Sequence, residues 1–329
     1  MRAVDAERPA VQGAQCARAV VMVRPAQFYA NPETLATNAF QNVVDASAAQ
    51  MLAAARAEFD GAVEALTHAG VRVAVLEADP KRDTPDALFP NNWFSTHADG
   101  RLVLYPMSTA NRRAERRPVD LGKLLAGQHW QITDTLDLTS LEQRGLIVEG
   151  TGSLVLDRDA RLAYAALSPR THAEAVEIVC RALNFEAVPF HAHDSAGREI
   201  YHTNVLMSVG PSLAVLASEL VQPGADLRRV FDALEQSGKT LLDLSAAQVS
   251  EFAGNVLFLE SGSGTPLVAL SRRAWKSLTR AQRQLLESHA QPVSCAVETI
   301  EHVGGGGIRC MLAEIFLPPA GITGALAPR

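Results

Sequence analysis

Apolar residues in this chain recur with two different spacings, and the change from one to the other divides the sequence into similar units. Residues 145–190 show the pattern best. Residues 145–167 predict two strands around the turn-forming DRDAR, 168–183 predict a helix with Ser168 as its N-cap, and 185–190 predict a further short strand. This unit therefore runs strand, strand, helix, strand.

The same order recurs through most of the chain. Hairpins are predicted within 88–106, 201–221 and 251–271. Each is followed by a stretch with helical spacing of its apolar residues and then by a short apolar strand. Together with 145–190, these segments make four complete units.

A fifth unit is divided between the two ends of the sequence. Residues 18–25 and 71–78 predict strands on either side of an Ala-rich helix over 46–69, and the missing strand is expected from 307–318. Five units whose last strand completes the first would close into a ring, which removes exposed sheet edges. The alternative that periodicity leaves open is an ordinary α/β sandwich.

Composition limits the class of protein further. The 329 residues are 47% hydrophobic and 20% charged, which suits a globular core, and a net charge of −6 leaves no basic footprint for nucleic acid. No apolar stretch is long enough to cross a membrane. Residues 1–18 lack the apolar core of a secretory signal, so we expect a flexible tail there, a single domain over 19–318, a second tail over 319–329, and a cytoplasmic protein.

One of the four cysteines has an unusual setting. Cys16, Cys180 and Cys295 belong to no CxxC pair and are expected to be free thiols, the last two of them buried. Cys310 follows four glycines at 304–307, which are costly to order and typical of backbone that approaches something closely. We therefore interpret Cys310 as a nucleophile at the mouth of a pocket, against the alternative of a flexible loop followed by a buried thiol.

A nucleophilic thiol needs a group that moves protons. Among the nine histidines, His202 opens an expected strand in which it shares a face with Asn204, and His302 is the rival base. His191 and His193 are a weak metal signal without a second cluster, so no metal is expected.

Other polar residues stand in apolar surroundings. Glu149 lies beside glycine in an expected strand, where a carboxylate must be paired or exposed to a ligand or water. Asn91 and Asn92, between aromatic residues, indicate either a polar contact in an apolar wall or a plain turn. Arg112 and Arg113 read as a solvated helix start, unless one of them binds an anionic substrate group.

Several of these motifs, in this order, resemble the guanidine-modifying, or amidinotransferase, superfamily. GGGGIRC at 304–310 resembles the segment before the nucleophilic Cys of arginine and agmatine deiminases. HTN at 202–204 resembles their His-x-Asp element, and EGTG at 149–152 resembles their Glu-Gly-Gly-Asp element. SPRT at 168–171 resembles a Ser-x-Arg-Thr stretch of deiminases and dimethylarginine dimethylaminohydrolases, which adds Arg170 as an expected substrate-binding residue.

The resemblance covers about residues 19–318 and implies an α/β fold of the pentein type, a five-bladed propeller of ββαβ units. NRRAE at 111–115 is similar to a basic segment that contacts a substrate carboxylate in some members. Together with PNNWF at 90–94 and the HTN variant, it places the chain closest to the branch of citrulline-utilisation hydrolases.

Two departures from the deiminase pattern bear on the substrate. The position of an Asp in the early hairpin is occupied by Asn91 or Asn92, and the Asp of the His-x-Asp element is Asn204. In the relatives, both carboxylates pair with a cationic guanidinium. Neutral amides remove about two charge-assisted contacts and suit a neutral ureido group, whose carbonyl needs a donor. We therefore expect citrulline or a similar N-carbamoyl amine.

The expected reaction is hydrolysis of a linear C–N bond without a cofactor. Cys310 attacks the ureido or amidino carbon, His202 protonates the leaving nitrogen and then activates water, and Glu149 orients His202 and holds a substrate nitrogen. The substrate-binding residues are expected to be Asn91, Asn92, Asn204, Arg112, Arg113 and Arg170.

Other readings remain open. They are an arginine deiminase or dimethylarginine dimethylaminohydrolase acting on a guanidinium, an amidinotransferase, and a non-enzymatic pentein binding protein. The expected partner is a small ureido or guanidino amino acid, with no nucleic acid and no membrane, and a homo-oligomer is compatible with the sequence.

Overall fold

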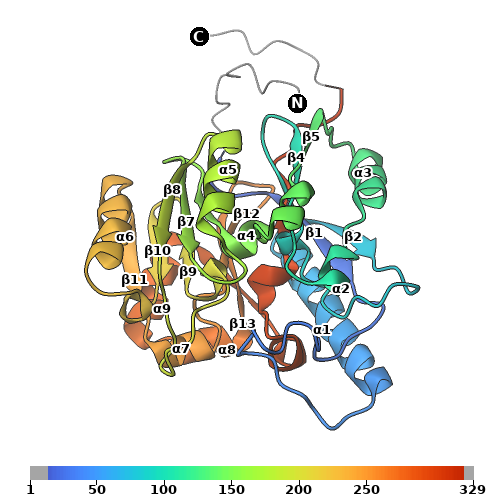
Figure 1. The fold of residues 1–329 in the computed structure, drawn as a ribbon, viewed down its shortest axis with the longest axis horizontal. Coiled ribbons are helices and arrows are strands. Elements are labelled where there is room, and N and C mark those ends of the chain that lie inside the picture. The colour runs from blue at the N-terminus through green and yellow to red at the C-terminus, as the bar shows by residue number, and fades with distance from the viewer. Residues whose placement is uncertain (1–13, 322–329) are drawn as a thin grey trace.

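The computed structural model describes residues 14–321, which form five three-stranded sheets arranged around a common centre (Figure 1). In each sheet the middle strand pairs antiparallel with one neighbour and parallel with the other. This is the ββαβ unit that the hydrophobic pattern predicts, and we call each unit a blade.

The strands of blades 2 to 5 are consecutive in the chain, whereas blade 1 includes a strand from the C-terminal segment. Blade 1 contains β15 (Ala313–Glu314), β1 (Ala19–Arg24) and β2 (Arg72–Glu77). Blade 2 contains β3 (Phe94–Thr96), β4 (Arg101–Leu104) and β5 (Asp134–Asp137). Blade 3 contains β6 (Val155–Asp157), β7 (Leu162–Ala166) and β8 (Glu186–Phe190). Blade 4 contains β9 (Met207–Val209), β10 (Leu213–Leu216) and β11 (Thr240–Asp243). Blade 5 contains β12 (Leu257–Glu260), β13 (Pro266–Ser271) and β14 (Gln291–Cys295).

The ring closes through the two ends of the chain. Strand β15 pairs antiparallel with β1, with Val20 opposite Glu314 and Val21 opposite Ala313. The C-terminal segment thus supplies the missing strand of the first unit, and the predicted closed pentein ring is confirmed.

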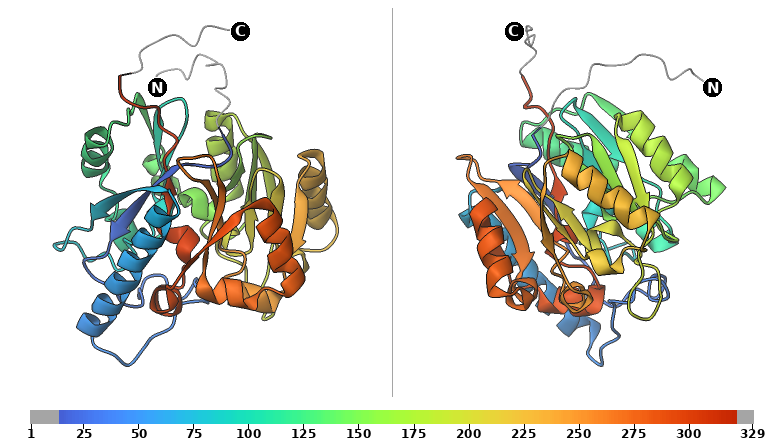
Figure 2. Two further views of the ribbon diagram at one scale, coloured as in Figure 1. Left: turned by 180° about the vertical axis from the view of Figure 1, so that it is seen from behind. Right: turned by 90° about the vertical axis from the view of Figure 1, so that its left-hand side faces the viewer.

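Each blade carries a main helix near the rim of the ring (Figures 1 and 2). These helices are α1 (Ala48–His68), α3 (Pro118–Gly127), α5 (Ala173–Leu183), α6 (Ala225–Gln236) and α9 (Arg280–His289). Four of them contact the third strand of the preceding blade, as α1 does with β14 and α6 does with β8. The helices therefore join neighbouring blades. Shorter helices are α2 (Ala110–Arg113), α4 (Gly150–Ser153), α7 (Ala246–Ser250) and α8 (Arg272–Ser277).

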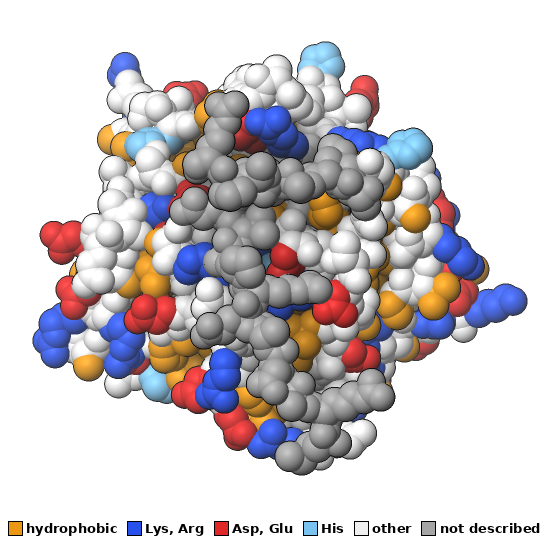
Figure 3. Space-filling model, turned by 90° about the horizontal axis from the view of Figure 1, so that it is seen from above, with side chains coloured by type: hydrophobic (Ala, Val, Ile, Leu, Met, Phe, Trp, Pro, Cys, Tyr) orange, Lys and Arg blue, Asp and Glu red, His pale blue; other side chains and the backbone are white. Residues whose placement is uncertain are grey.

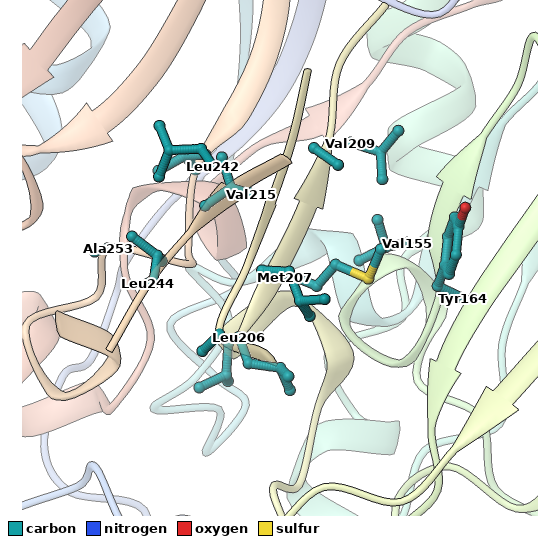
Figure 4. Close-up of a cluster of buried hydrophobic side chains, with 14 of the residues drawn as sticks. Val155, Tyr164, Leu206, Met207, Val209, Val215, Leu242, Leu244 and Ala253 are labelled. Atoms are coloured by element: carbon teal, nitrogen blue, oxygen red, sulfur yellow. The ribbon is translucent and has the colours of Figure 1, made fainter. Parts of the chain in front are cut away.

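The apolar core lies between blades as well as within them. Figure 4 shows a part in which Val155 and Tyr164 of blade 3, Met207 and Val215 of blade 4 and Ala253 of blade 5 share one buried cluster. Burying such side chains contributes about 1.5–3 kcal/mol each for the larger ones. Packing across blade boundaries makes the ring one cooperative unit.

The chain ends differ from expectation. Gln15 and Cys16, placed in the predicted flexible tail 1–18, are buried, and the carbonyl of Ala17 accepts a hydrogen bond from the Glu260 amide. At the other end, Ala320 N donates to His129 O, so the predicted tail 319–329 begins with a paired segment. These residues of the two predicted tails are therefore held by the fold, and residues 1–13 and 322–329 lie outside the described part.

Two further properties follow from the described residues 14–321. Their helices include none long and apolar enough to span a bilayer. On the face seen in Figure 3, acidic and basic side chains of the described residues are interspersed.

Candidate active site

The polar candidates gather because each blade places a polar segment just before its first strand. Asn92 ends a 3₁₀ turn two residues before β3, and Glu149 is the N-cap of α4, which leads into β6. His202 precedes a 3₁₀ turn that leads into β9. Asn255 stands two residues before β12, and Cys310 lies in a 3₁₀ turn three residues before β15. The ring geometry brings these five segments to one place.

The thiol of Cys310 is held by two amides. Asn204 Nδ2 donates to Cys310 Sγ at 3.4 Å, and Asn255 Nδ2 donates to the same atom at 3.3 Å. Cys310 is buried, and this burial raises the pKa of its thiol, while the hydrogen bond from Asn255 opposes the rise. Asn204 was predicted to lie near the reacting group, whereas Asn255 was not predicted at all.

His202 and Glu149 form a buried pair. His202 Nε2 lies 2.8 Å from Glu149 Oε2, and Glu149 Oε1 accepts the Ser108 amide at 2.9 Å. Burial opposes the charge of Glu149, but the hydrogen bond from His202 and the positive charge of Arg170 lower its pKa to about 2. Burial lowers the pKa of His202 to about 4 even beside Glu149. At neutral pH the pair is therefore a neutral imidazole donating to a carboxylate.

Gly152 is required for this arrangement. A Cβ at position 152 would lie 2.2 Å from Asn92 Nδ2 and 2.8 Å from His202 Nδ1, so both of these side chains would have to move. The absence of a side chain lets the α4 backbone approach both groups. The second glycine of the EGTG motif thus explains how His202 and Asn92 come to lie against the same turn.

Arg112 is a buried supporting residue rather than a solvated one. Its Nε and Nη2 donate to the two carboxylate oxygens of Glu115, both at 2.9 Å, and its Nη1 donates to Asn92 Oδ1 at 2.8 Å. The reading as a solvated helix start is therefore wrong for Arg112. Nη2 also donates to the carbonyl of Phe89, so Arg112 has little capacity left for a substrate carboxylate.

Arg113 and Asn91 lie apart from the thiol pocket. Arg113 Nε donates to Met107 O at 2.8 Å, and its side chain is 39% exposed. The Asn91 side-chain amide is buried, and its polar atoms have no hydrogen-bond partner among the described residues. Neither residue lines the pocket at Cys310.

A small pocket opens at Cys310. Its lining residues are Asn38, Asp86, Phe89, Asn92, Arg112, Arg170, Tyr201, His202, Gly304, Gly305, Gly306 and Cys310. The two cations among them are Arg112 and Arg170. Arg170 donates through Nε and Nη2 to Thr37 Oγ1, while its Nη1 lies 3.8 Å from Glu149 Oε2.

Asp86 is a pocket residue that the sequence analysis missed. Its Oδ2 accepts from Asn31 Nδ2 at 2.6 Å, whereas Oδ1 is buried without a hydrogen-bond partner among the described residues. Burial raises the pKa of this carboxyl. Asp86 stands six residues before Asn92, in the same loop. Its position in the sequence does not distinguish it from an ordinary turn residue.

The other histidines considered as a base or as metal ligands lie outside the pocket lining. His302 is exposed and is absent from the pocket lining. His191 pairs with Asp226, with Nδ1 2.8 Å from Oδ2, and the described residues hold no cluster of three or more side chains that could ligate a metal. The four cysteines, all within the described part, are free.

The sequence matches a known family over most of its length. A family model described as "N,N dimethylarginine dimethylhydrolase, eukaryotic" matches residues 24–317. The chain therefore belongs to this family of hydrolases, which act on carbon–nitrogen bonds in non-peptide substrates. The expected guanidine-modifying superfamily is confirmed. A search of curated proteins finds no match.

Solved structures share the fold. The apo structure of ArgZ, described as an arginine dihydrolase from the ornithine-ammonia cycle in cyanobacteria, aligns over 92% of this chain with a TM-score of 0.69 and 15% identity, and the chain spans 41% of that protein. The substrate-bound N-terminal domain of ArgZ aligns over 90% of this chain and 97% of its own, with a TM-score of 0.66 and 15% identity.

A dimethylarginine dimethylaminohydrolase variant carrying an S-methyl-L-thiocitrulline adduct aligns over 91% of this chain and all of its own, with a TM-score of 0.62 and 11% identity. At these identities the likeness shows the fold alone. The pentein architecture is thus common to proteins described as acting on different arginine-like molecules.

Proposed function

We propose that this protein hydrolyses the ureido C–N bond of citrulline, or of a similar N-carbamoyl amine, through a covalent intermediate on Cys310. One observation carries the substrate assignment. The groups that hydrogen-bond to the thiol are the neutral amides of Asn204 and Asn255, and not carboxylates. A neutral ureido group needs both donors and acceptors, which an amide supplies and a carboxylate does not.

The charge balance of the site supports a neutral reacting group. Glu149 is paired with His202 and lies 3.8 Å from Arg170, and Glu115 is paired with Arg112. These two carboxylates already have partners, and burial raises the pKa of the pocket carboxyl of Asp86, which disfavours its charged form. A guanidinium placed against Asn92 and Asn204 would lack about two charge-assisted contacts, each stronger than a neutral hydrogen bond.

The reaction begins from the neutral thiol and neutral imidazole. The proton of Cys310 passes to His202 as Sγ attacks the ureido carbon, and the imidazolium then gives this proton to the leaving nitrogen. The C–N bond breaks, ornithine leaves and the enzyme carries an S-carbamoyl group. His202 next removes a proton from water, which attacks the thioester-like carbon. The C–S bond breaks, Cys310 regains its proton, and carbamate decays to ammonia and CO2.

The α-carboxylate of the substrate has one suitable partner in this scheme. Arg112 and Arg113 were the expected candidates, but Arg112 is engaged with Glu115 and Asn92, and Arg113 is outside the pocket lining. Arg170 lines the pocket, and its Nη1 hydrogen-bonds to no other residue described here. We therefore assign the carboxylate to Arg170.

A second candidate function is hydrolysis of a guanidino group, as in arginine or an N-methylated arginine. It is favoured by the family description, by the described activity of ArgZ, and by Asp86, whose unpartnered Oδ1 belongs to a pocket residue and could accept a guanidinium N–H. A variant ArgZ domain described as covalently bound to a reaction intermediate gives a precedent for the covalent step in either reading.

Product analysis separates these functions. The protein is incubated with citrulline, arginine, agmatine and methylated arginines, with and without an acceptor amine, and the amino-acid products are identified. Ornithine and ammonia from citrulline are expected. Citrulline or ornithine formed from arginine, or citrulline formed from methylarginine, would support the second function, and an amidino group found on the acceptor amine would indicate a transferase.

Cys310→Ser supplies the matched control for that experiment. A hydroxyl is a far weaker nucleophile than a thiolate at neutral pH, so turnover should be abolished while the fold is kept. Cys180→Ser and Cys295→Ser, which change buried thiols elsewhere, should affect stability more than rate. If Cys310→Ser retains most of the activity, the covalent mechanism is wrong.

A further inference from the structure

The position before the first strand of blade 5 carries a residue to which the reaction above gives no role. Asn255 stands two residues before β12, as Asn92 stands two residues before β3. Blade 1 contributes the thiol at the corresponding place, and blade 4 contributes Asn204 three residues before β9. By its place in the ring, Asn255 belongs with these site residues.

The Asn255 side chain is fixed between two loops. Its Nδ2 donates to Asn204 O at 2.9 Å and to Cys310 Sγ at 3.3 Å, and the residue is 1% exposed. A Cβ at Gly307 would lie 2.7 Å from Asn255 Oδ1, so the last glycine of the run leaves the space that this amide fills. The side chain thus spans the loop of blade 4 and the glycine run before Cys310.

The contact with sulfur has a direct electrostatic consequence. A hydrogen bond donated to an ionised acceptor is stronger than one donated to a neutral acceptor, so an N–H aimed at Sγ favours S⁻ over S–H. Among the described side chains, only the amides of Asn204 and Asn255 donate hydrogen bonds to Sγ. These two donors act against the burial that disfavours the thiolate.

We propose that Asn255 is a positioning residue that aims the Sγ of Cys310 into the pocket and, together with Asn204, stabilises its thiolate. The proposal rests on the proposed function only in taking Cys310 as the nucleophile. It does not depend on whether the substrate is ureido or guanidino.

Alkylation by iodoacetamide tests the role of Asn255 without any substrate. The rate at Cys310 is measured against pH in the wild type, in Asn255→Ala and in the isosteric Asn255→Asp, with the modified peptide identified by mass spectrometry. Burial raises the pKa of Cys16 and of Cys295 to about 12 and that of Cys180 to about 11, so these thiols contribute little background.

Iodoacetamide should alkylate Cys310 in both variants about tenfold more slowly than in the wild type at pH 7, or slower still. The midpoint of the pH profile should move to higher pH. The effect should be larger for Asn255→Asp, because its carboxylate repels the thiolate. In turnover, kcat should fall more than KM rises. Asn184→Gly, at the exposed C-terminal cap of α5, is the matched control and should leave the profile unchanged.

Two results would overturn the proposal. One is an unchanged alkylation profile in both variants; combined with a lower kcat, it would show that Asn255 only supports the loops. The other is faster alkylation with an unmoved midpoint in Asn255→Asp, which would show that the residue shields the thiol. Failure of the proposed function looks different, because then Cys310 of the wild type itself would be unreactive or no substrate would turn over.

Discussion

The expected role of His202 as a general acid–base depends on its burial as well as on its imidazole ring. Its imidazole lies against Glu149, which fixes the proton on Nε2, and burial keeps the ring neutral at pH 7. A neutral histidine can accept the thiol proton in the first step and return it to the leaving amine in the second. The buried carboxylate therefore orients the base and stabilises the imidazolium that forms briefly.

Replacing the base tests this division of roles. His202→Ala should lower kcat by about 10²–10⁴, the usual contribution of a general acid–base group. The change also leaves Glu149 buried without its hydrogen-bond partner, so the variant should be less stable as well. Steady-state rates on the best substrate, with circular dichroism as a check of folding, measure both effects.

The matched control is His302→Ala, which alters the exposed rival base eight residues before the thiol. It should change kcat only slightly. A larger loss in His302→Ala than in His202→Ala would show that the wrong histidine has been assigned.

At the scale of elements, the sequence predicted which segments carry the site better than it predicted their conformation. The HTN segment was expected to open a strand, but Thr203–Val205 form a 3₁₀ turn, and the strand begins only at Met207. Polar residues over the first few positions suit a turn that points side chains to the ring centre. Alternation alone could not reveal that the strand starts later.

The SPRT segment shows the same limit. Ser168 was expected to cap the helix of blade 3, but α5 begins at Ala173 with His172 as its N-cap. Ser168 instead donates through Oγ to Tyr201 O and accepts from Arg170 N. This contact joins blades 3 and 4 and presents Arg170 to the pocket. Ser168 and Tyr201 are far apart in the sequence, so local capping rules cannot reveal their contact. These rules instead predict Ser168 as a helix N-cap.

Asn255 was missed for a related reason. In EFAGNVL it reads as an ordinary polar residue before a strand. Its importance appears only when the residues that precede the first strands of the five blades are compared with one another. That comparison requires knowing that the five blades close into a ring. The periodicity of the sequence indicated such a ring but was also compatible with an α/β sandwich.

The element that leads into the glycine run contains another buried acid. Glu301 lies in the π-helix Ile300–Gly304 and is fully buried, and burial raises the pKa of its carboxyl to about 7. The nearest guanidinium, Arg273 Nη1, is 3.9 Å away. Because the folded-state pKa is raised, this group adds stability below its ordinary value of 4.5, and that contribution is lost as pH rises through about 7.

Glu301→Gln should remove this pH dependence. Relative to the wild type, the variant should gain on the order of 2 kcal/mol in unfolding free energy between pH 5 and pH 8. Urea unfolding at both pH values measures the difference. Glu186→Gln, an exposed change in β8, is the control and should show no such gain. Parallel pH curves for wild type and Glu301→Gln would contradict a buried neutral carboxyl.

For the molecule as a whole, the ring is joined by strand β15 and also by a side chain from the N-terminal segment. Gln15 Nε2 donates to Leu156 O in blade 3 and to Val209 O in blade 4, both at 3.0 Å, and its Oε1 accepts the Arg158 amide at 2.6 Å. A single side chain thus satisfies three buried backbone groups of two blades. The residue was assigned to a flexible tail because residues 1–18 lack the apolar core of a secretory signal.

Gln15→Ala should therefore destabilise the protein by about 2–4 kcal/mol, because it leaves these backbone groups buried and unpaired. The unfolding free energy from urea titration gives the change. Gln236→Ala, at the exposed end of α6, should change it by less than about 0.5 kcal/mol. Equal, small effects of both substitutions would show that the Gln15 contacts contribute nothing to the closed ring.

The central claim is that neutral amides in the site, at positions where related enzymes carry carboxylates, select a ureido group, and one comparison of kcat/KM tests it most directly. Citrulline and arginine are assayed with the wild type and with Asn92→Asp, Asn204→Asp. Asn204, 3.4 Å from Sγ, should carry most of the effect, because a carboxylate at 92 would pair partly with Arg112. The wild type should prefer citrulline, and the double variant should shift the ratio toward arginine by roughly a hundredfold. A wild type that hydrolyses arginine and ignores citrulline, or a ratio that does not move, would contradict the account.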